Sequence, residues 1–447
     1  MTANLIGHGL IDYVFVFFML AYAFLAGITR PHRILYILPA CLSCFFFIPV
    51  GSNLTADKLV PAIFIVTIFL SKGPNYFSTS KKNANTWVGN MWIMIAVSAI
   101  VGSIYTDYYA GFVKSPFIST RLIIQTVSYI NLLLLFIIAR KEISKPKGKE
   151  LLLKSFVITT TLLTIYGIYQ YFAHQLGLPY RGIVYSASST GFGGYYDSQD
   201  IVFRVNSFAN EPKRLTYFLV ISLIILLKYR KQIISRLNSL LFYVVVLAHA
   251  VVLWLTYATS IYISVSIFII FLLIYSIFID FNQSLFKQLF LFLIIGASFY
   301  SYQKIYFDQL YEIRVDKQIE KEEVRAEVKG QKFMMNYPEM FVLGIGPGNY
   351  NFALSKEYKG KAGLAENGRY LVPFNSGIMT YIYDVGIIGF LLIFYPFILI
   401  LMNNKVASKN DFSIFVVFLF CTAITLNPGT TLFLFIGAFE GIKLLEK

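Results

Sequence analysis

Charged residues are scarce in this chain. Asp, Glu, Lys and Arg make up 14% of its 447 positions, while 57% of the residues are hydrophobic. A soluble globular domain carries about 25% charged residues, because its surface is hydrated. A soluble core cannot bury so large an excess of apolar side chains, so the composition excludes a soluble globular protein and predicts a membrane protein with many spans.

Cysteine and histidine are also rare, with three and four residues respectively. Cys41, Cys44 and Cys421 all lie inside apolar stretches, which do not stabilise the thiolate that a zinc or redox site needs. We therefore expect no metal site. The net charge is +15, and in a membrane protein most of this charge anchors the cytoplasmic loops. We therefore expect no nucleic-acid partner either.

Apolar stretches fill most of the chain and predict an all-α, polytopic bundle of about 12–14 transmembrane helices. They lie at 11–28, 34–50, 59–71, 87–104, 121–139, 151–172, 215–227, 239–256, 261–280, 285–303, 376–402, 412–426 and 431–444. Stretches such as 59–71 and 215–227 are shorter than the roughly 20 residues that a perpendicular span needs. Their helices have to extend into neighbouring residues or tilt.

The distribution of Lys and Arg predicts the orientation of these spans. The loops richest in them are 29–33, 72–86, 140–154, 228–236, 281–287, 403–411 and 443–447. Because these loops hold 20 of the 38 basic residues, they are assigned to the cytoplasm. Two long polar insertions, 173–214 and 304–373, fall on the other side, where we expect the chemistry.

The insertions divide the chain into five parts. We expect N-terminal transmembrane helices over 1–172, a first outer loop over 173–214 and central transmembrane helices over 215–303. A second, large and partly helical outer loop follows over 304–373, and C-terminal transmembrane helices over 374–447.

Few ionisable residues lie within the predicted spans. The main ones are Asp12, His249, Asp384 and Glu440, each near a span end or beside polar neighbours. We expect their side chains to reach toward an interface. Their small number argues against proton-coupled transport.

Arginines mark the place where the first insertion returns to the membrane, in the run RVNSFANEPKR over 204–214. Guanidinium groups make two-pronged bonds to phosphate oxygens, so Arg204 and Arg214 suit a lipid-linked diphosphate, although ordinary lipid headgroups would satisfy them too. Pro212 fits the first turn of a helix. Glu211 is a candidate general base, or else a charge that caps this helix.

The second insertion predicts a helix from Lys304 to about Asn336, because this stretch has no proline and one glycine. Its basic residues share one face of the helix, and several of them follow one another four positions apart. Like charges at a spacing of four residues destabilise a helix. The members of this stripe are Arg314, Lys317, Lys321, Arg325, Lys329 and Lys332. An anion opposite the stripe would explain it, either a substrate diphosphate or lipid headgroups, and a solvated charged face is the alternative.

A glycine-rich run, FVLGIGPGNY over 341–350, follows the predicted helix. Such a turn can bring backbone N–H groups close to an anion, so Gly346, Gly348 and Asn349 are candidate substrate-binding residues. A purely structural turn would have the same composition. Arg369 and Asn375 are further candidates, because the chain re-enters the membrane there.

The order of these motifs resembles the bacterial O-antigen polymerase and O-antigen ligase superfamily. The shared features are RxxSxxxEP at 204–212, a long outer loop, LGIGPGN at 343–349 and Asn375 before a glycine-containing span. The resemblance covers roughly 200–400 by motif and the whole chain by hydropathy. It implies a C-type glycosyltransferase of the inner membrane that uses undecaprenyl-diphosphate-linked glycans, with no nucleotide sugar, essential metal or other cofactor.

Within this resemblance, Arg204 corresponds to the arginine that holds the diphosphate, and the Glu-Pro pair is similar to that of the polymerases. The chain departs from the family at two places. Thr259-Ser260 stands where the family has a Ser-Arg turn, and Phe374-Asn375 stands where ligases have His-Asn. The role of the missing arginine would pass to one of Arg314, Arg325, Arg369 and Arg214.

We therefore expect an O-antigen polymerase with Arg204, Glu211, Arg314 and Arg325 as catalytic residues. Its partners would be undecaprenyl-diphosphate-linked oligosaccharides as donor and acceptor, membrane lipids and a chain-length-determinant protein. An O-antigen ligase and a lipid-linked oligosaccharide flippase are the alternatives. A flippase would not need such long outer loops and would want cationic residues within its spans.

Overall fold

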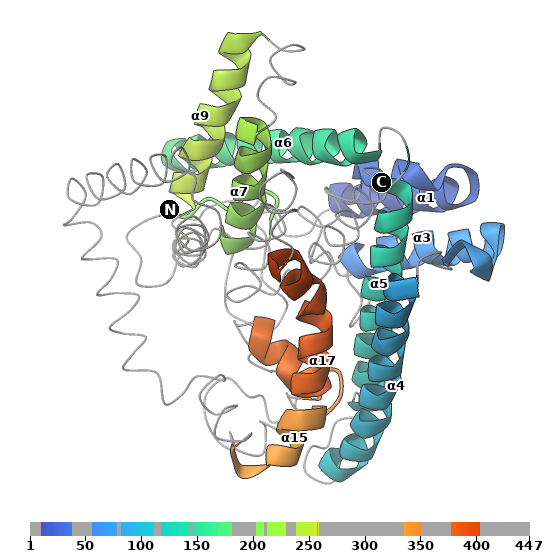
Figure 1. The fold of residues 1–447 in the computed structure, drawn as a ribbon. Coiled ribbons are helices and arrows are strands. Elements are labelled where there is room, and N and C mark those ends of the chain that lie inside the picture. The colour runs from blue at the N-terminus through green and yellow to red at the C-terminus, as the bar shows by residue number, and fades with distance from the viewer. Residues whose placement is uncertain are drawn as a thin grey trace. The chain divides into compact units, whose positions relative to one another are not determined.

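The computed structural model describes residues 10–37, 56–77, 82–110, 118–143, 145, 148–180, 203–209, 212–228, 238–256, 258, 335–349 and 377–402. These residues are mostly helical, and no strand occurs among them (Figure 1). The all-α prediction is confirmed for this part of the chain.

The helices agree closely with the apolar stretches of the sequence. They are α1 (Leu10–Thr29), α3 (Ala56–Lys72), α4 (Lys82–Ala110), α5 (Ile118–Ile143), α6 (Gly148–Leu176), α7 (Pro212–Lys228), α9 (Ser239–Leu255), α15 (Pro338–Leu343) and α17 (Gly377–Met402), with 3₁₀ turns η1 (Pro31–Arg33) and η2 (Pro74–Phe77). Each of them except α15 and the two 3₁₀ turns coincides with a predicted span. The short stretches at 59–71 and 215–227 lengthen into helices of 17 residues, as their lengths required.

Three segments are long and apolar enough to cross a membrane, namely Trp87–Ile104 in α4, Leu122–Ile143 in α5 and Glu150–Leu176 in α6. Shorter apolar segments occur in α1, α3, α7, α9 and α17. The chain is thus a helical membrane protein. The total of about 12–14 spans stays a prediction, because all or most of the stretches 34–50, 261–280, 285–303, 412–426 and 431–444 lies outside the described residues.

The chain forms two compact units that do not follow the five sequential parts. Unit 1 comprises Met1–Asn90, Val127–Tyr262 and Pro428–Lys447, and unit 2 comprises Met91–Thr126 and Ile263–Asn427. Helices α4 and α5 each contribute residues to both units.

In unit 1, α1 packs against α3, and α6, α7 and α9 pack against one another. The contact between α1 and α3 is close, because a Cβ on Gly27 would lie 1.8 Å from Thr67 Oγ1. Small residues of this kind let helix backbones approach within a membrane.

A polar network links the middle of α6, α7 and α9. Thr160 Oγ1 donates to Ser222 Oγ at 2.6 Å, Ser222 Oγ lies 3.2 Å from His249 Nε2, and His249 Nδ1 donates to Val245 O at 2.8 Å. His249 is fully buried by protein. The expectation that it reaches an interface is therefore wrong, because a serine on a neighbouring helix satisfies it inside the bundle.

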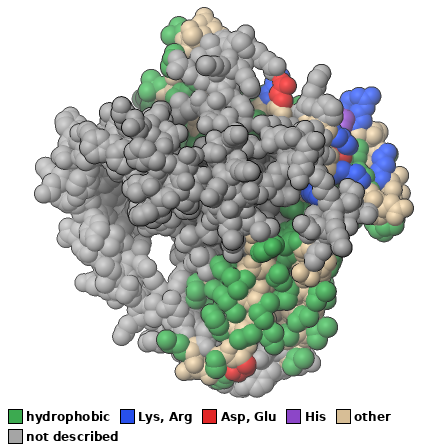
Figure 2. Space-filling model, in the orientation of Figure 1, with side chains coloured by type: hydrophobic (Ala, Val, Ile, Leu, Met, Phe, Trp, Pro, Cys, Tyr) green, Lys and Arg blue, Asp and Glu red, His purple; other side chains and the backbone are tan. Residues whose placement is uncertain are grey.

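Basic side chains gather at one end of unit 1. Figure 2 shows Lys, Arg and His side chains over the region of α1 and α3. Here Tyr76 donates to Glu142, which also accepts from Lys145 Nζ at 2.6 Å. Burial, and then the neighbouring Glu142 carboxylate, raise the pKa of Tyr76 well above its usual range, so the phenol stays protonated and keeps donating.

Hydrogen bonds within unit 1 join helix ends that the charge distribution assigns to the same side. On the side predicted to be cytoplasmic, η2, which follows α3, meets the end of α5 through Tyr76 and Glu142. On the opposite side, Thr216 in the first turns of α7 lies 2.9 Å from Thr256 at the end of α9. The contacts therefore support the predicted alternation of spans. Which side faces the cytoplasm remains a prediction.

Candidate functional site

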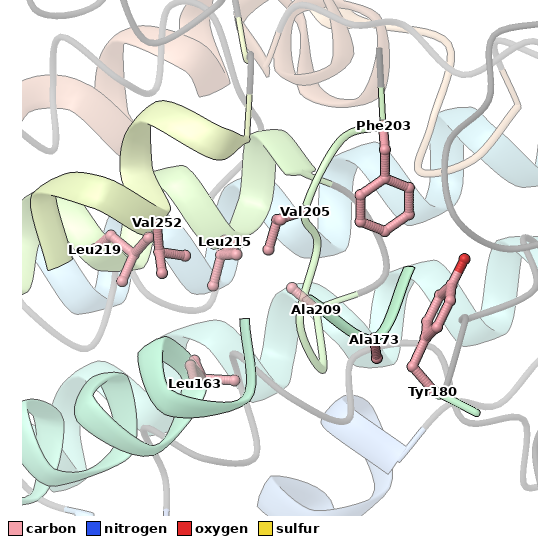
Figure 3. Packing of buried hydrophobic residues seen from close by; sticks show 9 residues of the cluster. All are labelled: Leu163, Ala173, Tyr180, Phe203, Val205, Ala209, Leu215, Leu219 and Val252. Atoms are coloured by element: carbon pink, nitrogen blue, oxygen red, sulfur yellow. The ribbon is translucent and has the colours of Figure 1, made fainter. Parts of the chain in front are cut away.

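The described end of the first insertion, residues 203–209, lies against α6 and α9 in unit 1. Val205 N donates to Leu255 O at 2.9 Å, and Ser207 Oγ donates to Leu163 O at 2.7 Å. Phe203 and Val205 both enter a hydrophobic cluster between the helices (Figure 3). The cluster consists of Leu163, Ala173, Tyr180, Phe203, Val205, Ala209, Leu215, Leu219 and Val252.

Tyr180 and Phe203, the described residues on either side of 181–202, are brought together by aromatic contacts. The Phe203 ring stacks on His174 with centroids 4.0 Å apart, and Tyr180 meets Phe203 edge-on at 5.7 Å. Tyr180 Oη also lies 3.2 Å from His174 Nδ1. The position of Phe203, and with it that of the next residue, is thereby fixed over the end of α6.

Gln170 of α6 holds the backbone of this segment in a bent conformation. Its Oε1 accepts the N–H groups of Asn206 at 3.1 Å and Ser207 at 2.7 Å, and its Nε2 donates to Asn206 Oδ1 at 2.7 Å. Ser207 has a φ of +53°, in the left-handed region that costs a non-glycine residue about 1–3 kcal/mol. The bonds to Gln170 offset this strain and define where Arg204 leaves the backbone.

Arg204 is 8% exposed, and its Nε donates to Thr256 O at 3.1 Å. Thr256 caps the C-terminal end of α9, where the helix dipole and the last carbonyl groups favour a cation. A guanidinium buried in a membrane protein is costly, and such groups usually mark a functional site. Arg204 therefore places a cation beside the last carbonyl groups of α9.

A second buried non-helical segment, residues 344–349, lies in unit 2. Gly344, Gly346 and Gly348 have φ values of +76°, +88° and +80°, which glycine adopts without strain. The turn follows α15 and packs against α17, which is itself interrupted at Gly386 with φ +69° and ψ 177°.

Near the interruption of α17, the glycine turn donates to one backbone carbonyl and one side chain of this helix. Ile345 N donates to Tyr383 O at 2.8 Å, and Gly348 N donates to Asp384 Oδ1 at 2.9 Å. Asp384 is 4% exposed. The expectation that this carboxylate reaches an interface is wrong, because the turn encloses it and supplies a donor.

Helix α4 completes the arrangement in unit 2. Asn349 Nδ2 donates to Gly102 O at 2.8 Å and to Ile345 O at 2.9 Å. A Cβ on Gly346 would lie 2.2 Å from Gly102 Cα, so the two glycines meet backbone to backbone. The turn joins α4 to α17, and its contacts are those of a structural junction. We call residues 344–349 with Gly102 and Asp384 the glycine junction.

Five of the predicted site residues are described. Arg204 is buried, Arg214 is half-buried in the first turn of α7, and Gly346, Gly348 and Asn349 belong to the glycine junction. The glycine turn does bring a backbone N–H to an anion, but the anion is the chain's own Asp384. A role for these three residues in substrate binding remains a prediction. Glu211, Lys321, Arg314, Arg325, Arg369 and Asn375 lie outside the described residues.

The sequence did not single out Gln170, Asn206 or the partner role of Asp384. Gln170 is a polar residue in an apolar stretch, and this is the one signal in the sequence that could have identified it. Across the described residues, no group of three or more His, Cys, Asp or Glu side chains is placed to hold a metal ion.

No protein-family model matches the chain, and no curated protein is significantly similar to it. The resemblance to the O-antigen superfamily therefore depends on the motifs quoted above.

Proposed function

We propose that this chain is a polymerase-type glycosyltransferase, which joins undecaprenyl-diphosphate-linked repeat units of a surface polysaccharide at the periplasmic face of the bacterial inner membrane. The observation that carries the proposal is the buried Arg204, held by the Thr256 carbonyl at the end of α9. It is the first residue of the RxxSxxxEP motif, and Pro212 of that motif begins α7 as the sequence predicts.

The proposed reaction needs cationic groups beside the diphosphate that leaves. A sugar hydroxyl of the acceptor attacks the anomeric carbon of the donor, the bond from that carbon to the lipid diphosphate breaks, and the lipid diphosphate leaves as an anion. Opposite charges about 4 Å apart attract by roughly 4 kcal/mol at an effective dielectric constant of about 20. Arg204 would stabilise the leaving group in this way.

The other groups of the proposed site come from the resemblance and from the charge pattern. Glu211 would take the proton of the attacking hydroxyl. Arg314 and Arg325 would add positive charge at the diphosphate, and Arg214, Lys321 and Arg369 would bind the substrate. The replacement of the ligase histidine by Phe374 favours a polymerase over a ligase.

The test is complementation of a deletion strain with Arg204→Ala and Arg204→Lys at matched protein level, followed by gel analysis of the surface polysaccharide. We expect Arg204→Ala to leave chains of one repeat unit. Arg204→Lys should rescue only part of the length, because two-pronged bonding is lost. Arg33→Ala, at an exposed arginine of η1, is the matched control and should give full-length chains.

Two outcomes would contradict the proposal. Long chains from Arg204→Ala at wild-type protein level would remove this arginine from the reaction. Complete loss of surface repeat units in the deletion strain would indicate a flippase, since a strain lacking only the polymerase still transfers single units. A ladder made by the purified protein from a defined lipid-linked repeat unit would establish the activity directly.

A further inference from the structure

Asn206 carries a buried amide nitrogen with no hydrogen-bond partner among the described residues. The side chain is 1% exposed, and its Nδ2 makes no bond there. Buried donors are nearly always satisfied, and one that is not needs an explanation. A ligand oxygen is such an explanation.

The orientation of this amide follows from its neighbours. Backbone N–H groups only donate, so the Gln170 atom that contacts the N–H groups of Asn206 and Ser207 has to be Oε1. The other atom of that amide is then Nε2, a donor, and the Asn206 atom that it meets at 2.7 Å has to be Oδ1. Nδ2 of Asn206 is therefore the atom without a partner, and rotating the amide would place two donors against each other.

Arg204 and Asn206 are separated by one residue, and neither belongs to the hydrophobic cluster. Phe203 and Val205, at the alternate positions, both enter the hydrophobic cluster (Figure 3). Arg204 and Asn206 are instead bonded to polar groups of α9 and α6 respectively. An anion at Arg204 would thus have a neutral N–H donor available two residues further along the chain.

We infer that Asn206 is a further substrate-binding residue, whose Nδ2 donates to an acceptor oxygen of the lipid-linked substrate that Arg204 holds. This inference rests on the proposed function. The acceptor is a phosphate oxygen of the diphosphate, because donors to charged oxygens make the stronger bonds and Arg204 selects an anion. A hydroxyl oxygen of the first sugar offers the same acceptor chemistry, and the experiment separates the two.

The experiment measures binding to the full-length protein in lipid nanodiscs with two probes, undecaprenyl diphosphate without a glycan and the same lipid carrying one repeat unit. The variants are Asn206→Ala, Asn206→Asp and Arg204→Ala. Asn206→Asp keeps the Oδ1 that Gln170 uses and replaces only the donor, so it serves where the alanine variant does not fold. Ser222→Ala, a buried polar residue of the same unit, is the matched control.

We expect Asn206→Ala to bind both probes about tenfold more weakly than wild type, and Asn206→Asp more weakly still, because a carboxylate repels phosphate. Ser222→Ala should bind like wild type. The unfolding midpoint of each variant, measured without ligand, tests whether that variant is folded.

The outcomes distinguish this inference from the proposed function. Equal binding by wild type and Arg204→Ala, or no binding by wild type, would overturn the proposed function. Weakened binding by Arg204→Ala with wild-type affinity in both Asn206 variants would overturn the role of Asn206 alone. A loss confined to the glycan-bearing probe would place the acceptor oxygen on the sugar and overturn the phosphate assignment. A comparable loss in Ser222→Ala would attribute the effect to packing and overturn the inference.

Discussion

Residues 203–209 of unit 1 and the glycine junction of unit 2 are both short, buried, non-helical segments packed against helices. In the glycine junction, the donors of Ile345, Gly348 and Asn349 all have acceptors within the chain, including the carboxylate of Asp384. In segment 203–209, the Asn206 Nδ2 donor has none among the described residues, and a guanidinium lies two positions before it. A glycine-rich turn can thus be filled by the protein's own carboxylate, whereas the segment without glycine leaves a buried donor, which we propose a ligand satisfies.

The largest effect on stability is expected from a change within the glycine junction. Gly346→Ala would force a Cβ to within 2.2 Å of Gly102 Cα at a φ of +88°. We expect a loss of about 3 kcal/mol or more in stability, because backbone overlap is added to left-handed strain. The yield of monodisperse protein and its unfolding midpoint measure this loss.

Gly73→Ala is the matched control for that variant. Gly73 has a φ of +72°, but a Cβ there would meet nothing within 4 Å. It should cost only the left-handed strain of about 1–2 kcal/mol. Equal losses in the two variants would show that the close approach of Gly346 to Gly102 is not what stabilises the junction.

A smaller effect is expected from Asp384. Asp384→Ala leaves the buried Gly348 N–H without this acceptor, which should cost about 2 kcal/mol. Asp384→Asn keeps an acceptor oxygen and should cost less than about 1 kcal/mol. Denaturant unfolding of the two variants provides the measurement.

The length of the surface polysaccharide in a complemented strain tests whether Asp384 has a role besides stabilising the fold. If Asp384→Asn is folded and stable but gives only single repeat units, the charge itself serves the reaction. The glycine junction would then be part of the functional site, and the contrast between the two segments would fail.

The helices were predictable from sequence because their signal is local. Apolar stretches placed the ends of α5 and α6 within four residues and those of α4 within six, and Pro212 marked the start of α7. Arg204 could be singled out as well, since a charged residue beside a span is visible without any tertiary structure.

The remaining features depend on residues that meet only in three dimensions. Near the interruption of α17 at Gly386, Ile345 donates to Tyr383 from another part of the chain. The buried state of His249 depends on Ser222, and the orientation of Asn206 depends on Gln170, 36 residues earlier. No local pattern reveals such pairs, which is why charge alone placed His249 and Asp384 at an interface.

The finest test of the comparison is Gln170→Glu. A carboxylate at this position still accepts the N–H groups of Asn206 and Ser207, but its second oxygen is an acceptor where Gln170 has a donor. The Asn206 amide should therefore rotate so that its Nδ2 donates to the new carboxylate, and the donor is then satisfied within the chain, as in the glycine junction. We expect binding of undecaprenyl diphosphate to weaken tenfold or more, which corresponds to at least about 1.4 kcal/mol, without loss of the fold. The donor is withdrawn, and the added carboxylate also repels phosphate. Adding Asn206→Ala to Gln170→Glu should then weaken binding no further, because the donor has already been withdrawn. Additive losses in the double variant would mean that the rotated amide is not the cause, and that the vacant donor of Asn206 does not distinguish the two segments.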